Sequence, residues 1–440
     1  MGANVLNSRD DSVFIPAPLP LRRGITSLHA LVALCFLAVV VGYTDRVNLA
    51  VASVAMREQL HWSQTTKGIV LSSFFVGYIS LMAVSGWLAT RFGGVRVLGF
   101  AVLAWSLFTL ATPPAAMTSL AMLIAVRIGM GLGEAAMFPA CYELIGRWLP
   151  QAERTRAVTR ILSGIPVGTV AGLAVSGWLV THWGWEWTFY IFGVIGVLWC
   201  LGWWRWWNGT LRSSEITGDA ITGGSASAST QDRVQSIPWR RLFREPAIWA
   251  LFVGHFSSNW LLYFLLSWLP SYFKDGLGLT ITDAGLFSAG PWVAMAIATT
   301  IAGAIADSMA QRGISMTLIR KTMQTVGLLV PAACLFLLQD VASAPTALVL
   351  ICLSAAALGC SWAGYAANAI DLAPRHAGLI MGVSNTFATV PGIVGVSLSG
   401  WLFDVTGTFS AAFLLTAAIS AIGAIVYLIF ASAKPILEQS

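Results

Sequence analysis

The chain has 440 residues, of which 57% are apolar and only 10% are charged, and its formal net charge is +6. A soluble protein of this length would carry about 25% charged residues. The composition therefore excludes a soluble enzyme and predicts an all-α polytopic membrane protein. The positive charge does not indicate a nucleic-acid partner, because basic residues that face an anionic lipid leaflet account for it.

Twelve runs of mostly apolar residues are each long enough to cross a hydrocarbon layer about 30 Å thick. The predicted spans are 28–55, 65–90, 95–112, 118–146, 157–181, 186–207, 246–273, 285–306, 317–338, 343–368, 377–404 and 409–433. A change of composition after the sixth span separates the first six from the last six. The Gly/Ser/Thr-rich stretch that follows residue 208 has few apolar residues and is typical of a flexible linker.

The two sets of six spans resemble each other. "IPVGTVAGLAVSGWL" in the fifth span is similar to "VPGIVGVSLSGWL" in the eleventh, with the same direction of crossing. Such a parallel repeat predicts two pseudo-symmetric six-helix halves with a substrate site between them near mid-membrane. The expected organisation is an N-terminal tail (1–27), a first half (28–207), a linker (208–245), a second half (246–433) and a C-terminal tail (434–440).

The basic residues predict the orientation of these spans. Most fall on the side of the termini and linker, and only Arg57, Lys67 and Lys274 fall on the other. Positively charged loops stay in the cytoplasm, so both termini are expected to be cytoplasmic. Because no plastid transit segment is recognised at the N-terminus, the predicted location is the inner (plasma) membrane of a bacterial cell. A functional monomer is expected.

Four charged residues stand inside apolar spans. Asp45 and Arg46 are adjacent in the first span, and Arg127 and Glu134 share one face of the fourth, two helical turns apart. Each charge at the bilayer centre costs roughly 2.5–3.5 kcal/mol on insertion scales. One interpretation is an ion-pair network that fixes helix register. The other is an anion site with proton-accepting carboxylates, because guanidinium groups bind carboxylates and phosphates bidentately and low dielectric favours the protonated form of an acid.

The second half offers neutral polar side chains instead. His255, Asn259 and Tyr263 recur every four residues in the seventh span. Further candidates for substrate contact in the tenth and eleventh spans are Tyr365, Ser384 and Asn385, and those in the first half are Tyr43 and Tyr78. Such groups suit a hydroxylated organic anion, but each could equally form an interhelical hydrogen bond. His255 has either a proton-linked role or a packing role.

Several segments resemble the anion:cation symporter family of the major facilitator superfamily, which includes sialin, plant phosphate and ascorbate carriers and bacterial sugar-acid permeases. The segments are "DRVNLAVA", "SSFFVGY", "GWLATRFGGVRVLG", "RIGMGLGEAAMFPA", "LPQAERTRAV", "HFSSNW", "DLAPRHAG" and "GVSNTFATVPGIVG". The resemblance implies the major facilitator fold and a proton- or sodium-coupled carrier of anions, with no bound cofactor.

The resemblance also implies roles for individual residues. Arg46 would anchor the substrate carboxylate, Asp45 and Glu134 would couple transport to protons, and Arg127 would be the partner of these acids. Tyr78 and Asn385 would contact the substrate.

Together these features predict proton-coupled symport of a small organic anion, a sugar acid or another carboxylate, by alternating access. The alternatives are a phosphate or aromatic-carboxylate carrier and an organic-anion or drug exporter of the same fold. A membrane enzyme is not supported, because no span carries a catalytic Ser/His/Asp or H-E-x-x-H pattern. A sensor would need a signalling domain, and a channel would not need titrating acids.

Overall fold

A computed structural model describes residues 21–211, 243–373 and 377–436, and the described residues contain helices but no strand. Twelve of its helical segments are long and apolar enough to cross a membrane, which confirms the predicted spans. The elements of the first six spans are α1 (Leu21–Gln59), α2 (Gln64–Phe92), α3 (Gly94–Thr118), α4 (Leu120–Glu134), α5 (Met137–Trp148), α6 (Gln151–Leu162), α7 (Gly164–Trp183), α8 (Trp185–Trp206) and the π-helical turn η1 (Trp207–Leu211).

The last six spans follow the same plan. Their elements are α11 (Pro246–Ser271), η2 (Tyr272–Gly276), α12 (Ile281–Gln311), α13 (Met316–Leu337), η3 (Leu338–Asp340), α14 (Ala344–Gly359), η4 (Trp362–Ala366), α15 (Ala367–Leu372), α16 (Ala377–Thr406) and α17 (Ser410–Phe430). Most of the expected tail 1–27 and linker 208–245 lies outside the described residues, as do residues 437–440.

The fourth span is not one continuous helix. Helix α4 ends at Glu134 and α5 begins at Met137. A proline ring collides with the carbonyl group four residues earlier and has no N–H to donate to it, and Pro139 stands four residues after Ala135 in this gap. The fifth span is interrupted in the same way between α6 and α7, because Leu162, the last residue of α6, stands four residues before Pro166. The first interruption makes Glu134 the last residue of α4, in the interior of the span.

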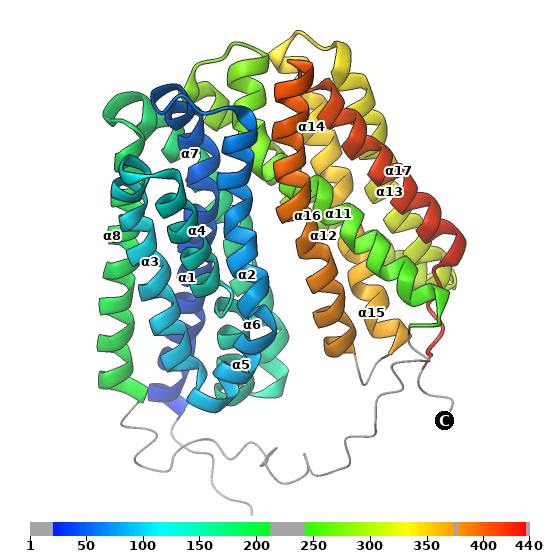
Figure 1. Cartoon of the computed structure of the whole chain (residues 1–440). Helices are drawn as coiled ribbons and strands as arrows, with labels where there is room; N and C mark the ends of the chain where they lie inside the picture. The colour runs from blue at the N-terminus through cyan, green and yellow to red at the C-terminus, as the bar shows by residue number, and fades with distance from the viewer. Residues whose placement is uncertain (1–20, 212–242, 374–376, 437–440) are drawn as a thin grey trace, which may run out of the picture.

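The two halves pack on each other through equivalent helices. The second span contacts the eleventh (α2 on α16), and the fifth contacts the eighth (α7 on α12). A rotation that exchanges the halves converts one contact into the other, as a parallel repeat requires. We call the end where α1 begins and α17 finishes the terminal end, and the opposite end the distal end. The ribbons of the two halves converge at the distal end and diverge toward the terminal end (Figure 1).

Polar contacts join the halves at the distal end. Arg57 Nη2 lies 3.2 Å from Asp275 Oδ2, and Lys274 Nζ lies 3.1 Å from Glu58 Oε1. In addition, Asp404 of α16 caps the first turn of α2 across the interface. It accepts hydrogen bonds from the backbone N–H groups of residues 64 and 65, at 2.9 and 2.7 Å. This conformation is therefore closed at its distal end.

The Asp404 cap is expected to control how often the distal end opens. Asp404→Asn removes the negative charge from two charge-assisted hydrogen bonds at a helix N-terminus, each worth about 1.5–3 kcal/mol. We expect the population open at the distal end to rise by roughly tenfold or more. Spin labels at Thr118→Cys and Asp340→Cys, at the distal ends of the two halves, should then show a larger share of long distances.

Asp283 supplies the matched control for this experiment. Its carboxylate also lies at the distal end, but it accepts a hydrogen bond from Thr280 of its own half (2.7 Å). Asp283→Asn should leave the distance distribution as in the wild type. An unchanged distribution in Asp404→Asn would show that the cap does not hold the distal end closed.

Candidate functional site

Arg46 and Glu134, which the sequence placed in different spans, form a direct ion pair. Arg46 Nη2 lies 2.6 Å from Glu134 Oε1, and the two side chains are 7% and 0% exposed. Breaking such a buried pair by removing one partner typically costs about 3–5 kcal/mol, although the intact pair stabilises a protein little compared with apolar packing. Glu134 is the last residue of α4, and its side chain crosses to Arg46 of α1.

Three aromatic rings enclose the Arg46 guanidinium group. Its central carbon lies 4.7 Å from the ring centroid of Tyr43, 5.0 Å from that of Phe74 and 5.1 Å from that of Tyr78. Cation–π contacts of this kind hold a guanidinium group at about 0.5–2 kcal/mol each without neutralising its charge. The predicted residues Tyr43 and Tyr78 thus meet at Arg46, together with Phe74, whose role the sequence did not indicate.

Asp45 and Arg127 are buried close to this pair but are not joined to it directly. Asp45 is fully buried and within electrostatic reach of Glu134 and Arg127. Neither of its carboxylate oxygens has a hydrogen-bond partner among the described residues. Arg127 Nη1 contacts Met130 Sδ at 2.9 Å. The expected partnership of Arg127 with the acids is therefore electrostatic and at a distance, and no ion pair links them in the described part of the chain.

A small cavity lies beside both arginines at the interface of the halves. It has room for about one water molecule. Its lining residues are Arg46, Ala50, Leu71, Phe74, Phe75, Arg127, Leu266 and Ser267. Because α1, α2 and α4 of the first half and α11 of the second all contribute, a movement of the halves changes its size. A sugar acid would fit only after such a movement.

Three of the polar residues predicted in the second half meet each other. His255 Nδ1 lies 2.8 Å from Ser384 Oγ, and the His255 ring stacks on Tyr365 with centroids 4.2 Å apart. These residues come from α11, α16 and η4, and all three are buried. Asn259, one turn along α11, donates to the Ala388 carbonyl at 2.9 Å, so its amide nitrogen makes an interhelical hydrogen bond.

Tyr365 occupies its position because the tenth span is not a regular α-helix there. Residues 362–366 form the π-helical segment η4, and single π-turns inside membrane helices often occur at functional sites. Gln324 of α13 supports this segment. Its Oε1 accepts a hydrogen bond from the Tyr365 backbone N–H (3.1 Å), and its Nε2 donates to Ser258 Oγ (3.0 Å).

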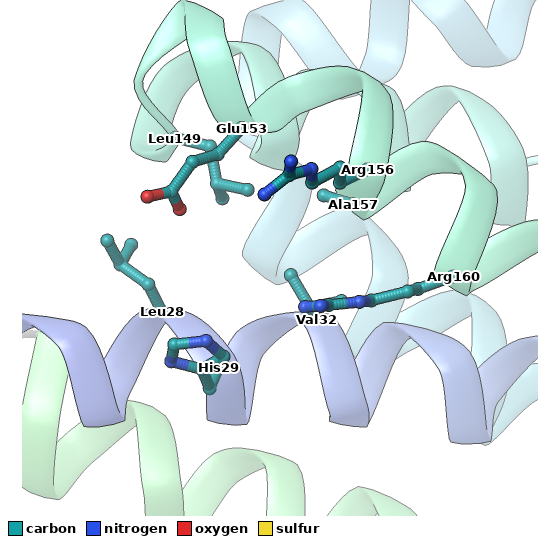
Figure 2. A pocket seen from close by; sticks show the side chains of 8 residues that line it. All are labelled: Leu28, His29, Val32, Leu149, Glu153, Arg156, Ala157 and Arg160. Atoms are coloured by element: carbon teal, nitrogen blue, oxygen red, sulfur yellow. The ribbon is translucent and has the colours of Figure 1, made fainter.

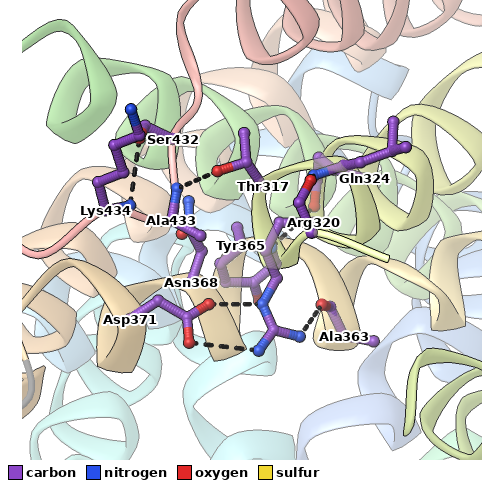
Figure 3. Close-up of polar contacts among 12 residues, drawn as sticks. Thr317, Arg320, Gln324, Ala363, Tyr365, Asn368, Asp371, Ser432, Ala433 and Lys434 are labelled. Carbon is purple, nitrogen blue, oxygen red and sulfur yellow. Dashed lines mark hydrogen bonds and ion pairs between the residues drawn. The ribbon is translucent and has the colours of Figure 1, made fainter. Parts of the chain in front are cut away.

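Arg320 supports the same segment one turn earlier along α13. It donates to the Ala363 carbonyl at 3.0 Å and to the Asp371 carboxylate at 2.7 Å (Figure 3). The sequence analysis counted Arg320 only among the basic residues on the side of the termini, and it did not single out Gln324 or Asp371. The sequence feature that could have indicated Arg320 and Gln324 is their four-residue spacing, which places two polar side chains on one face of an apolar span.

The aromatic residues of α2 and α11 connect the Arg46 group to the second half. Phe75 of α2 packs on Tyr263 of α11, with ring centroids 4.5 Å apart, and Tyr263 is within electrostatic reach of Arg46. Asn385 faces the first half rather than His255, and its Nδ2 lies 3.1 Å from Met82 Sδ. The predicted residues thus form two groups, one around Arg46 and one around His255, with Asn385 outside both.

A second cavity, of about 140 Å³, lies at the terminal end between α1 and α6. Figure 2 shows two guanidinium groups, an imidazole and a carboxylate around it. Its lining residues are Leu28, His29, Val32, Leu149, Glu153, Arg156, Ala157 and Arg160. Basic side chains at the end of a span are typical of the face toward an anionic leaflet. In the described residues, no group of three His, Cys, Asp or Glu could hold a metal ion.

Comparison with known proteins assigns the family. The model of the family described as the Major Facilitator Superfamily matches residues 34–396. The chain belongs to the Major Facilitator Superfamily. The fold and the transporter family predicted from sequence are thereby confirmed, and the superfamily's members are not enzymes.

Relatives of this facilitator include anion transporters. It is 36% identical over 412 residues to "Ascorbate transporter, chloroplastic" of Arabidopsis thaliana, covering 93% of this chain and 75% of that protein. It is 34% identical to "Sodium-dependent phosphate transport protein 1, chloroplastic" of the same plant, over 93% and 80% of the two chains. These relatives confirm the resemblance to the anion:cation symporter family.

Among solved structures, a bacterial homolog of the human lysosomal transporter Spinster, in an inward-facing and occupied conformation, superposes on this facilitator with a TM-score of 0.75. The two chains are 17% identical, and the match covers 91% of this chain and 96% of the other. At this identity the likeness concerns the fold alone.

Proposed function

We propose that the chain is a secondary active transporter that carries a small organic anion, a sugar acid or another carboxylate, in symport with protons. The observation that carries the proposal is the buried Arg46–Glu134 ion pair, 2.6 Å long, beside a cavity at the interface of the halves. A carboxylate substrate can replace the Glu134 carboxylate on Arg46, because Glu134 contacts Arg46 through Oε1 alone and a carboxylate of either kind is a natural partner of a guanidinium group.

Protonation provides the coupling in this proposal. When Glu134 binds a proton it loses its negative charge, and Arg46 becomes available for the substrate anion. Asp45, close by and without a hydrogen-bond partner among the described residues, binds a second proton. The halves then close at one end and open at the other. Release of the anion and of both protons at that end returns Arg46 to the ionised Glu134. Glu134 and the substrate thus compete for one cation, and this competition links the two fluxes.

The second half contributes selectivity for a hydroxylated substrate. His255, Ser384 and Tyr365 present hydrogen-bonding groups without a net charge. Such groups suit the hydroxyls of a sugar acid, and the relative named as an ascorbate transporter is consistent with this substrate class.

Phosphate is the second candidate substrate. Two guanidinium groups, Arg46 and Arg127, line the same cavity, and paired guanidinium groups are a common way to bind a phosphate dianion. A relative is named as a sodium-dependent phosphate transporter, which also makes sodium the alternative coupling ion. The carboxylate is favoured because Arg46 already holds a carboxylate in the closed site.

We further propose that the terminal end faces the cytoplasm and that the membrane is the inner (plasma) membrane of a cell. Arg154, Arg156 and Arg160 of α6 and Lys321 of α13 lie at the terminal end, as the positive-inside rule requires of a cytoplasmic face. With this orientation the distal end is external, and the conformation described here faces inward. A functional monomer is proposed.

Uptake into proteoliposomes tests the proposed function. Labelled hexonate, hexuronate, phosphate and an aromatic carboxylate are each offered with and without an acid-outside gradient, and with a sodium gradient alone. We expect one sugar acid to accumulate with the proton gradient and to leak back when a protonophore is added. Accumulation of phosphate alone, or accumulation that only sodium supports, would show that the proposed substrate or coupling ion is wrong.

A further inference from the structure

Lys67 is a fully buried cation that the proposed function leaves without a role. It lies in the first turn of α2 near the distal end. Its Nζ donates a hydrogen bond to Ser271 Oγ and lies 5.2 Å from the Trp268 ring centroid. Both partners belong to α11, in the other half. The burial of Lys67 is thus produced by the closure of the two halves, and opening of the distal end exposes it.

The closed interface does not neutralise Lys67. No carboxylate lies within 4 Å of its Nζ in the ranges that the structure describes. Asp275, the carboxylate within electrostatic reach, already accepts hydrogen bonds from Arg57 and Gln64. Burial of a charge without a carboxylate partner is unfavourable, and charged residues inside membrane helices usually mark a pathway. Stabilisation of the closed state is therefore a poor explanation of this lysine.

Lys67 shares one face of α2 with the residues that surround Arg46. Leu71, Phe74 and Tyr78 follow it at four, seven and eleven residues, which places all four on one helical stripe. Leu71 and Phe74 line the cavity that holds Arg46. With a rise of 1.5 Å per residue, Lys67 stands roughly 10 Å closer to the distal end than Phe74.

We propose that Lys67 is the first binding site for the carboxylate substrate when the distal end is open. An anion that enters between the halves meets this exposed ammonium group, which attracts it and passes it along the α2 face to Arg46. Closure of the distal end then moves Ser271 and Trp268 onto Lys67 and leaves the anion on Arg46. This inference rests on the proposed function and adds to it a residue that sets the apparent affinity at one face only.

The test compares KM at the two faces of the membrane. Carboxylate transport is measured in vesicles of known sidedness, with substrate offered first to the distal face and then to the terminal face. Lys67→Gln should raise KM at the distal face about tenfold, the value of one charge-assisted hydrogen bond. KM at the terminal face and the maximal rates should stay within about twofold of the wild type, and Lys67→Arg should restore most of the affinity.

Lys274 is the matched control, because it is a basic residue at the same end and pairs with Glu58 across the interface. Lys274→Gln should leave KM at the distal face unchanged. The proposal is overturned if Lys67→Gln leaves that KM unchanged, if it lowers the rate equally from both faces, or if Lys274→Gln has the same effect.

The variant Arg46→Ala distinguishes failure of the proposal about Lys67 from failure of the proposed function. The role of Lys67 alone would be overturned if the wild type carries carboxylate, Arg46→Ala does not, and Lys67→Gln transports with unchanged KM. A wild type that carries no carboxylate would overturn both.

Discussion

Arg46→Ala is expected to reduce carboxylate uptake by about 100-fold or more. The guanidinium group is the cation that the substrate carboxylate would contact, in an aromatic cage at 4.7–5.1 Å from three ring centroids. Truncation of one member of a buried, hydrogen-bonded charge pair costs about 2–5 kcal/mol, and each 1.4 kcal/mol is a factor of ten. Initial rates of gradient-driven uptake in proteoliposomes measure the loss directly.

Two companion variants separate substrate binding from folding. Arg46→Ala leaves Glu134 buried without its partner, so the double variant Arg46→Ala/Glu134→Gln removes both charges and should recover thermal stability without recovering transport. Arg46→Lys keeps the charge but loses the bidentate fork, and we expect uptake reduced about tenfold. Uptake by Arg46→Ala within about threefold of the wild type would show that the pair is structural.

Glu134→Gln is expected to abolish concentrative uptake while leaving exchange of labelled for unlabelled substrate. Glutamine has nearly the shape of glutamate but cannot bind and release a proton. Because it does not hold Arg46 with a full charge, the substrate can occupy Arg46 at any pH. Wild-type uptake should fall as the external pH rises, since the ionised Glu134 stays on Arg46. The variant should show a nearly flat pH profile in the same vesicles.

Glu58→Gln is the control for this pH profile. Its carboxylate pairs with Lys274 at the distal end and its side chain is 53% exposed. We expect this variant to keep both the pH dependence and the accumulation of the wild type. If Glu134→Gln still accumulates substrate in response to a pH gradient, at the level of the wild type, Glu134 does not couple transport to protons. Asp45 would then be the carboxylate to test.

The charged residues of the site could be predicted from the sequence, but their pairing could not. Asp45, Arg46, Arg127 and Glu134 were identifiable because charges in apolar spans are costly and therefore noticeable. The pairing of Arg46 with Glu134 was not identifiable, because these residues are far apart along the chain and meet only where α4 ends. The same limit applies to Arg127, which lies within electrostatic reach of Asp45 and Glu134 but makes its closest side-chain contact with the Met130 sulfur. Its role as partner of the acids stays a prediction.

The neutral polar residues were less predictable than the charges. Ser, Asn and Tyr are common in membrane helices, so their presence alone does not separate a ligand contact from a helix contact. His255, Tyr365 and Ser384 do meet, whereas the Asn259 amide nitrogen donates to a backbone carbonyl. Gln324 and Arg320 support this group by hydrogen-bonding to the backbone of the π-helical segment η4. No local pattern in the tenth span indicated that segment.

Hydropathy and charge are properties of each residue along the chain, so the amino-acid sequence was sufficient to identify the membrane class, the twelve spans, the parallel repeat and the charges inside the spans. The folded chain was needed to show that Arg46 pairs with Glu134, that the halves touch through α2, α7, α12 and α16, and that Lys67 lies buried between them. These features depend on helices that approach from different halves, and the contact of two surfaces is a property of neither one alone. The Asp404 cap on α2 is the plainest case, because its donors and acceptor belong to opposite ends of the chain.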